Sequence, residues 1–144
     1  MGAAHLRRAA ARYHAVSDSS MSAPPALILV VEDDAELRAV VAESLTLEGY
    51  DVAEASDGLA ALHVARERHP ALILLDLMMP RMSGWDFRHE QRADPALADI
   101  PVVVMSAAIP SDVTRLDARA YLHKPFDFDA MLEKVATLTH SAPH

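Results

Sequence analysis

The chain has 144 residues, which is enough for one compact domain and too few for two ordinary ones. Its formal net charge of -8 gives no overall positive field for nucleic acid or anionic lipid, and no apolar run approaches the roughly 18 residues that a membrane-spanning helix needs. The chain lacks cysteine, which excludes disulfides and thiolate chemistry. We therefore expect a cytoplasmic globular domain with no nucleic-acid or membrane partner.

The first 25 residues differ from the rest of the chain. Arg7, Arg8 and Arg12 lie among alanines there, and the apolar segment that would follow them in a secretory signal is missing. We expect residues 1–25 to form a disordered extension, with Met21 as the more natural start. A short basic helix that binds a surface or a partner is the alternative.

From residue 26 onward, short apolar runs alternate with longer amphipathic stretches. Ala26–Val31 is apolar throughout, which predicts a strand buried on both faces. Apolar residues then recur at helical spacing from Leu37 to Leu45, and Gly49 follows as a helix terminator. The alternating segment Tyr50–Ala55 predicts a second, more exposed strand.

The next strongly apolar run ends abruptly on a carboxylate. A helix capped by Asp57 and stopped by Pro70 leads into this run, Ala71–Asp76, which predicts a buried strand with Asp76 at its carboxyl end. The remaining predicted elements are a helix after Ser83, a strand at Ile100–Met105, a short helix at Ser111–Asp117, a strand at Arg119–Leu122 and a last helix that contains Phe128 and Val135.

This alternation predicts an α/β fold, a three-layer α/β/α sandwich around a five-stranded parallel sheet with right-handed crossovers. In such folds, functional groups gather outside the carboxyl ends of the strands. The residues that we expect there could hold a metal and a phosphoryl group: Glu32, Asp33, Asp34, Asp76, Ser106 and Lys124.

Carboxylates that converge at one edge of a sheet repel one another and need a cation. Mg²⁺ prefers oxygen ligands, which Glu32, Asp33 and Asp76 would supply, and Mn²⁺ is the alternative ion. A carboxylate can also attack phosphorus, as in aspartyl-phosphate chemistry. The Ser106 hydroxyl and the Lys124 ammonium are suitable donors to the incoming phosphoryl oxygens.

Four segments resemble the signature segments of the response-regulator receiver family, and they occur in the family's order. They are Val30–Asp34 (VVEDD), Leu75–Gly84 (LDLMMPRMSG), Val104–Ala107 (VMSA) and Tyr121–Phe126 (YLHKPF). The resemblance covers about Ala26 to Thr139 and implies a receiver domain at residues 26–140, followed by a tail at 141–144. It also implies the flavodoxin-like strand order 2-1-3-4-5.

The resemblance implies a role for each residue that matches the motifs. Asp76 would be the phosphoacceptor, Ser106 would contact the phosphoryl group, and Lys124 would form an ion pair with Asp76 or its phosphate. The implied metal ligands are Glu32, Asp33, Asp76 and the backbone carbonyl of Met78, with Asp33 the direct ligand of the acidic pair. Asp34 would then be a bystander at the start of a helix.

The residues just before Pro125 carry two further implications. Tyr121 matches the aromatic switch position of the family, although a partly buried core role is equally compatible with its place in the sequence. The peptide bond between Lys124 and Pro125 is commonly cis in the family.

The sequence departs from the family between Ser106 and Lys124, where the interval is short and the fourth helix is therefore expected to be shortened. Asp117–Arg119 also replaces the family's usual Gly-Ala before the fifth strand. Because Met78 and Ala108 cannot readily orient an attacking water, we expect slow loss of the phosphoryl group.

We therefore expect a phosphorylation-dependent signalling module and not an enzyme. Its phosphoryl donor would be a histidine kinase or a histidine phosphotransfer protein, its target an unidentified downstream protein, and its state a monomer or a phosphorylation-dependent dimer. With only five residues after Thr139, no DNA-binding output domain is expected there. A phosphorylation-independent scaffold is the main alternative. A phosphatase ranks last because Met78 stands where a second acid would be needed.

Overall fold

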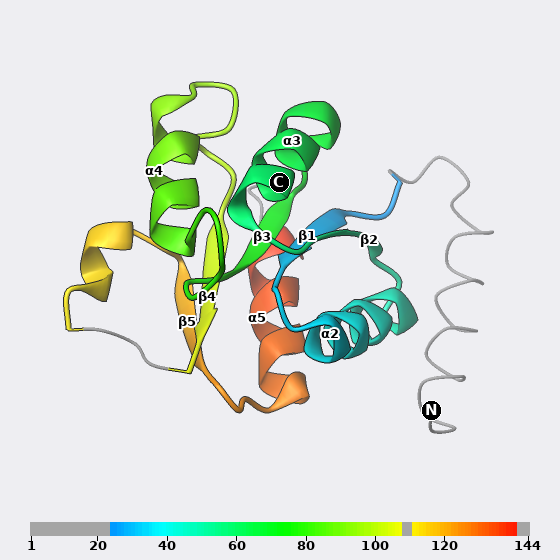
Figure 1. Cartoon of the computed structure of the whole chain (residues 1–144). Helices are drawn as coiled ribbons and strands as arrows, with labels where there is room; N and C mark the ends of the chain where they lie inside the picture. Colours follow the sequence, from blue (N-terminus) through cyan, green and yellow to red (C-terminus); the bar gives the residue numbers. More distant parts are fainter. Residues whose placement is uncertain (1–23, 108–110, 141–144) are drawn as a thin grey trace.

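The computed structural model describes residues 24–107 and 111–140, which form a parallel sheet of five strands between two layers of helices (Figure 1). The strand order is β2-β1-β3-β4-β5, as expected. The elements are β1 (Leu27–Val31), α2 (Ala35–Leu47), β2 (Asp51–Ala55), α3 (Gly58–Arg68), β3 (Leu72–Asp76), α4 (Gly84–Ala93), β4 (Val102–Ser106), the 3-10 helix η1 (Val113–Leu116), β5 (Ala120–His123) and α5 (Phe128–His140).

Every predicted strand is present, and none of its ends differs from the prediction by more than two residues. The largest shift is in β4, which begins at Val102 and not at Ile100. Pro101 lacks the backbone N–H that a ladder position would use, although its carbonyl still accepts a hydrogen bond from the Ile73 amide at 3.0 Å. The expected extension falls mainly on residues 1–23 and the expected tail on 141–144, and both lie outside the described residues.

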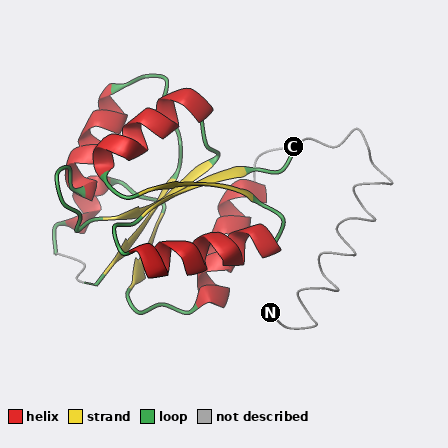
Figure 2. Cartoon of the chain, turned by 45° about the vertical axis from the view of Figure 1, so that its right-hand side comes forward, coloured by secondary structure: helices red, strands yellow, loops and turns green. Residues whose placement is uncertain are grey.

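Helices cover both faces of the sheet (Figure 2). A hydrophobic cluster lies on each face, between the strands and the helices. Leu29 and Ile73 belong to the cluster with residues of α3 and α4, whereas Ile28 and Leu72 belong to the cluster with residues of α2 and α5. Successive residues of a strand point to opposite faces, so both sets are buried. This two-sided burial explains the continuous apolar runs in the sequence.

Polar side chains cap the helices that begin near the carboxyl edge of the sheet. Asp34 is the N-cap of α2, and its Oδ1 accepts hydrogen bonds from the backbone N–H groups of Glu36 at 3.0 Å and Leu37 at 3.2 Å. This confirms the structural role expected for Asp34. Asp57 and Ser83 cap α3 and α4 in the same way.

The segment between β4 and β5 contains a short 3-10 helix, η1, in its described residues 111–119. Arg88 of α4 holds this helix, since its guanidinium donates to the carbonyls of Leu116 at 2.8 Å and Asp117 at 2.9 Å. A third bond reaches Gln91 Oε1 at 2.9 Å, and Arg88 is buried. A side chain of α4 therefore satisfies carbonyl groups at the end of η1.

Arg88→Met should lower the free energy of unfolding by about 2–4 kcal/mol, because buried carbonyls would lose their charged donor. Arg92→Met is the matched control on the same helix, because the exposed Arg92 donates only to the Arg115 carbonyl, at 3.1 Å. The control should cost less than about 1 kcal/mol. Urea unfolding measures both values, and equal losses would contradict the anchoring role of Arg88.

Candidate functional site

The carboxyl ends of four strands bring the predicted site residues to one edge of the sheet. Glu32 and Asp33 directly follow β1, Asp76 is the last residue of β3, Ser106 is the last residue of β4, and Lys124 directly follows β5. The parallel register aligns these ends, since Asp76 pairs with Met105 and Ser106 with His123. The fold therefore gathers chemistry-bearing residues from widely separated parts of the sequence.

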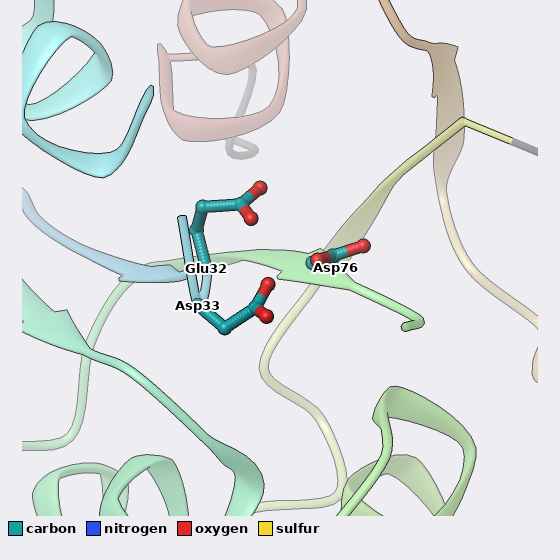
Figure 3. Close-up of side chains that lie close together, drawn as sticks. All are labelled: Glu32, Asp33 and Asp76. Atoms are coloured by element: carbon teal, nitrogen blue, oxygen red, sulfur yellow. The ribbon is translucent and has the colours of Figure 1, made fainter. Parts of the chain in front are cut away.

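Three carboxylates form the acidic part of the site. One ligand oxygen from each of Glu32, Asp33 and Asp76 lies within 4.8 Å of the others (Figure 3). Glu32 and Asp76 are buried, with exposed fractions of 1% and 2%, whereas Asp33 is exposed. This set of hard oxygen donors, open to solvent on the side of Asp33, fits a hard divalent cation.

Lys124 lies between two of these carboxylates. Its Nζ is 2.6 Å from Glu32 Oε1 and 3.5 Å from Asp76 Oδ2. The contact with Glu32 Oε1 is an ion pair. The expected pairing with Asp76 is therefore present, but the shorter contact is with Glu32, the more deeply buried of the two carboxylates.

Burial and mutual repulsion shift the ionisation of the buried groups. Burial raises the pKa of Glu32 to about 7, and the charge of Asp76 adds to this while Lys124 opposes it. Burial also raises the pKa of Asp76, against the opposing effects of the Met78 amide and Lys124. Burial alone would lower the pKa of Lys124, but the two carboxylates outweigh it and the pKa is raised. Lys124 is therefore charged, and the carboxylates remain in excess.

The loop after Asp76 contacts the carboxylate directly. The Met78 backbone N–H donates to Asp76 Oδ1 at 3.2 Å, and the Gly84 N–H donates to the Leu77 carbonyl at 3.1 Å. A Cβ atom at position 84 would lie 2.4 Å from the Asp76 carbonyl oxygen. Glycine is therefore required at position 84 for α4 to begin this close to the site.

Ser106 and Tyr121 occupy neighbouring strands beside the carboxylates. Ser106 is fully buried, and its carbonyl accepts a hydrogen bond from the Lys124 N–H at 2.8 Å. Tyr121 is partly buried, packs against the cluster that includes Val104, and donates from its hydroxyl to the Val113 carbonyl at 3.4 Å. The packing role of Tyr121 is present, and its switching role stays a prediction. The expected cis bond between Lys124 and Pro125 is confirmed.

One feature beside the site has no counterpart in the sequence analysis. Asp57 was expected only as a helix cap, and it does accept a hydrogen bond from the Ala60 N–H at 2.9 Å. It also forms an ion pair with Arg81, which lies 24 positions later in the chain. Because the two residues belong to different loops, no local spacing pattern indicates their contact.

Comparison with known proteins gives a family match over most of the chain. Residues 28–136 match the family model described as the response regulator receiver domain. The chain is 38% identical to the DNA-binding dual master transcriptional regulator RpaA of Synechocystis over 115 residues, which cover 77% of this chain and 48% of that protein. It is 36% identical to the response regulator MprA of a Mycobacterium species over 118 residues, covering 79% and 50%. The chain thus spans about half the length of these relatives.

Solved structures show the same architecture. The response regulator TrrA of Thermotoga maritima, solved in complex with Mg²⁺-BeF, is 33% identical and aligns with a TM-score of 0.71, covering 78% of this chain and 98% of that one. The chemotaxis protein CheY4 of Vibrio cholerae is 26% identical, with a TM-score of 0.74 and coverage of 79% and 98%. Among the described residues, none of the helices is long and apolar enough to cross a membrane. The chain belongs to the response regulator receiver domain family.

Proposed function

We propose that this receiver accepts a phosphoryl group on Asp76 in two-component signalling. The observation that carries the proposal is the meeting of Asp76 with two further carboxylates and one ammonium group at a single edge of the sheet. The buried carboxylate of Asp76 can act as a nucleophile toward phosphorus. The negative charge of the transferred phosphoryl group would then lie beside the positive charge of Lys124. The family match supports the same role.

In the transfer, Asp76 would supply the oxygen nucleophile, and the surrounding groups would orient it. A carboxylate oxygen of Asp76 forms a bond to phosphorus while the bond from phosphorus to the donor breaks, and the departing group keeps the electron pair. The Met78 N–H holds Oδ1 and thereby orients the carboxylate. Lys124 stabilises the negative charge of the phosphoryl oxygens from the side of Oδ2.

The excess of negative charge supports a divalent metal at this site. Mg²⁺, or Mn²⁺ in its place, would be held by Glu32, Asp33, Asp76 and the backbone carbonyl of Met78. When bound, the ion would neutralise the carboxylates and the phosphoryl oxygens. The ligand distances among the three side chains fit this use, because their oxygens already lie within 4.8 Å of one another.

Ser106 and Tyr121 would report the modification to the rest of the domain. The Ser106 hydroxyl is proposed to donate to the phosphoryl group, and Tyr121 to turn inward when Ser106 moves. The hydrogen bond from Tyr121 to the Val113 carbonyl connects this response to η1. Because η1 has only four residues, we keep a phosphorylation-independent scaffold as the second candidate function.

The proposed partners follow from the chemistry of the transfer. A histidine kinase or a histidine phosphotransfer protein would donate the phosphoryl group in the cytoplasm, and a downstream protein would recognise the phosphorylated form. The chain is proposed to assist its own phosphorylation without turning over a substrate. Its state would be a monomer, or a dimer that forms on phosphorylation.

Incubation with acetyl phosphate and Mg²⁺ should add one phosphoryl group to the wild-type chain, as measured by intact mass. Asp76→Ala should lose this adduct completely, because the nucleophile is gone. Asp34→Asn is the matched control: it removes an acidic charge from the same segment, retains the helix cap and should keep the adduct. An adduct on Asp76→Ala would overturn the assignment, and no adduct on the wild type would favour the scaffold.

The metal-free protein should lose stability as the pH rises from about 5 to 8. The pKa of Glu32 is about 7 in the folded state and near 4.5 when unfolded, so the folded state binds more protons between these values. The raised pKa of Asp76 acts in the same direction. We expect the free energy of unfolding to fall by about 1–3 kcal/mol over this range.

Urea unfolding in chelator at several pH values tests this prediction. In Glu32→Gln, most of the decline in the free energy of unfolding with pH should disappear, because the amide does not titrate. Adding Mg²⁺ should stabilise the wild type at pH 8, because the ion binds the folded state. The lowered pKa of Asp57 affects stability only at more acidic pH, where its carboxylate becomes protonated. A wild-type stability that rises between pH 5 and 8 would refute the prediction.

The phosphorylated chain should lose its phosphoryl group slowly, over many minutes. Met78 is 68% exposed and carries a thioether that cannot activate water. The second residue on which this expectation rests, Ala108, lies outside the described residues. Intact mass after removal of acetyl phosphate measures the decay, and Met78→Asn should accelerate it. Decay of the wild type within seconds would contradict the prediction.

A further inference from the structure

The loop between β3 and α4, residues 77–83, is attached to the first turn of α3. Arg81 forms an ion pair with Asp57, and the Gly58 N–H donates to the Met82 carbonyl at 3.2 Å. The contact at Gly58 is close, since a Cβ atom there would lie 2.5 Å from Met82 Cγ. The loop that directly follows the proposed phosphoacceptor is therefore held by the start of α3, through two residues that lie 24 positions apart in the chain, Arg81 and Asp57.

The carboxylate of Asp57 uses both of its oxygens. Oδ1 caps α3 through the Ala60 N–H, while Oδ2 meets the Arg81 guanidinium. Asp57 is buried, with an exposed fraction of 4%. The cap and Arg81 together lower its pKa, so the carboxylate is ionised at neutral pH. A buried carboxylate of this kind needs its cationic partner.

Arg81 has a backbone conformation that favours glycine. Its φ is 63°, and the turn around it is closed by a hydrogen bond from the Met82 N–H to the Pro80 carbonyl at 2.7 Å. A glycine would adopt this conformation at lower cost in free energy. The presence of arginine therefore points to a role for its side chain, which is largely exposed along its length but ends on the buried carboxylate of Asp57.

We propose that the ion pair between Arg81 and Asp57 positions the β3–α4 loop so that the Met78 N–H keeps its hydrogen bond to Asp76. The ion pair thereby sets the affinity of the site for Mg²⁺. Arg81 is then a positioning residue, three positions from the Met78 amide that donates to Asp76 Oδ1. A hydrogen bond from the Gly84 N–H to the Leu77 carbonyl joins the start of the loop to the start of α4. The Mg²⁺ part of this inference rests on the proposed function.

Arg81→Gly tests this inference, because it removes the ion pair and also relieves the unfavourable backbone conformation. We expect the thermal midpoint to fall, because the buried Asp57 carboxylate loses its cationic partner, although the relieved backbone offsets part of that loss. We expect the Mg²⁺ dissociation constant to rise roughly tenfold, the lower end of the effect seen when groups that orient metal ligands are removed. Fluorescence of Trp85, the single tryptophan, in the first turn of α4, follows Mg²⁺ titration. Arg81→Lys should recover part of the affinity.

Two further variants separate the ion pair from general effects of charge and capping. Arg66→Gln removes one positive charge from an ion pair with Asp94, in the last turn of α3, and should leave the Mg²⁺ affinity unchanged. Asp57→Asn keeps a capping oxygen for the Ala60 N–H but loses the charge. It should therefore weaken Mg²⁺ binding as Arg81→Gly does.

Hydrogen exchange of the Met78 amide in metal-free protein gives a readout that is independent of phosphorylation. The positioning role predicts faster exchange at Met78 in Arg81→Gly than in the wild type, with unchanged exchange in the strand core. Wild-type exchange at Met78 together with wild-type Mg²⁺ affinity in Arg81→Gly would overturn the inference. If the wild type itself took up neither Mg²⁺ nor a phosphoryl group, the proposed function would fail, whereas the exchange result would still decide the positioning role.

Discussion

Three carboxylates and a single ammonium group, that of Lys124, meet at the carboxyl edge of the sheet, and this charge imbalance governs the chemistry of the site. Glu32 and Asp76 are removed from water, and within the described part of the chain the Lys124 ammonium, itself partly buried, is the cation that contacts both of them. Ionised carboxylates lose the stabilisation by water when they are buried. Burial therefore raises the pKa of both carboxylates. The same imbalance makes the site receptive to a cation, so the instability of the metal-free site and its proposed chemistry have one origin.

The hydrophobic layers hold these charges together. The central strands β1 and β3 are covered on both faces, and their side chains have almost no freedom to shift along the sheet. A one-residue slip of β3 would move Asp76 off the edge and send its apolar residues to the wrong layers. The packing of the core is therefore what keeps mutually repelling carboxylates within a few ångströms of one another.

The region between β4 and β5 shows how a short connection is stabilised. In the described part of this region, the buried Arg88 of α4 donates to the carbonyls of Leu116, the last residue of η1, and of Asp117, the residue that follows it. Tyr121 reaches the other end of the same helix through the Val113 carbonyl. The response proposed to begin at Ser106 would thus meet a segment that is held from two sides.

Local signals in the sequence predict the fold class and the edge positions of Glu32, Asp33, Asp76 and Lys124, because strand periodicity and short motifs involve only neighbouring residues. The strand order follows from the family resemblance. The sequence also indicated that Asp34 is a bystander at the start of a helix, and the structure adds that its side chain caps that helix. Three contacts become apparent only in the folded chain: Lys124 lies nearer to Glu32 than to Asp76, Arg81 reaches Asp57, and Arg88 supports η1. These contacts join residues far apart in the chain, and the side-chain packing that selects them is absent from any local pattern.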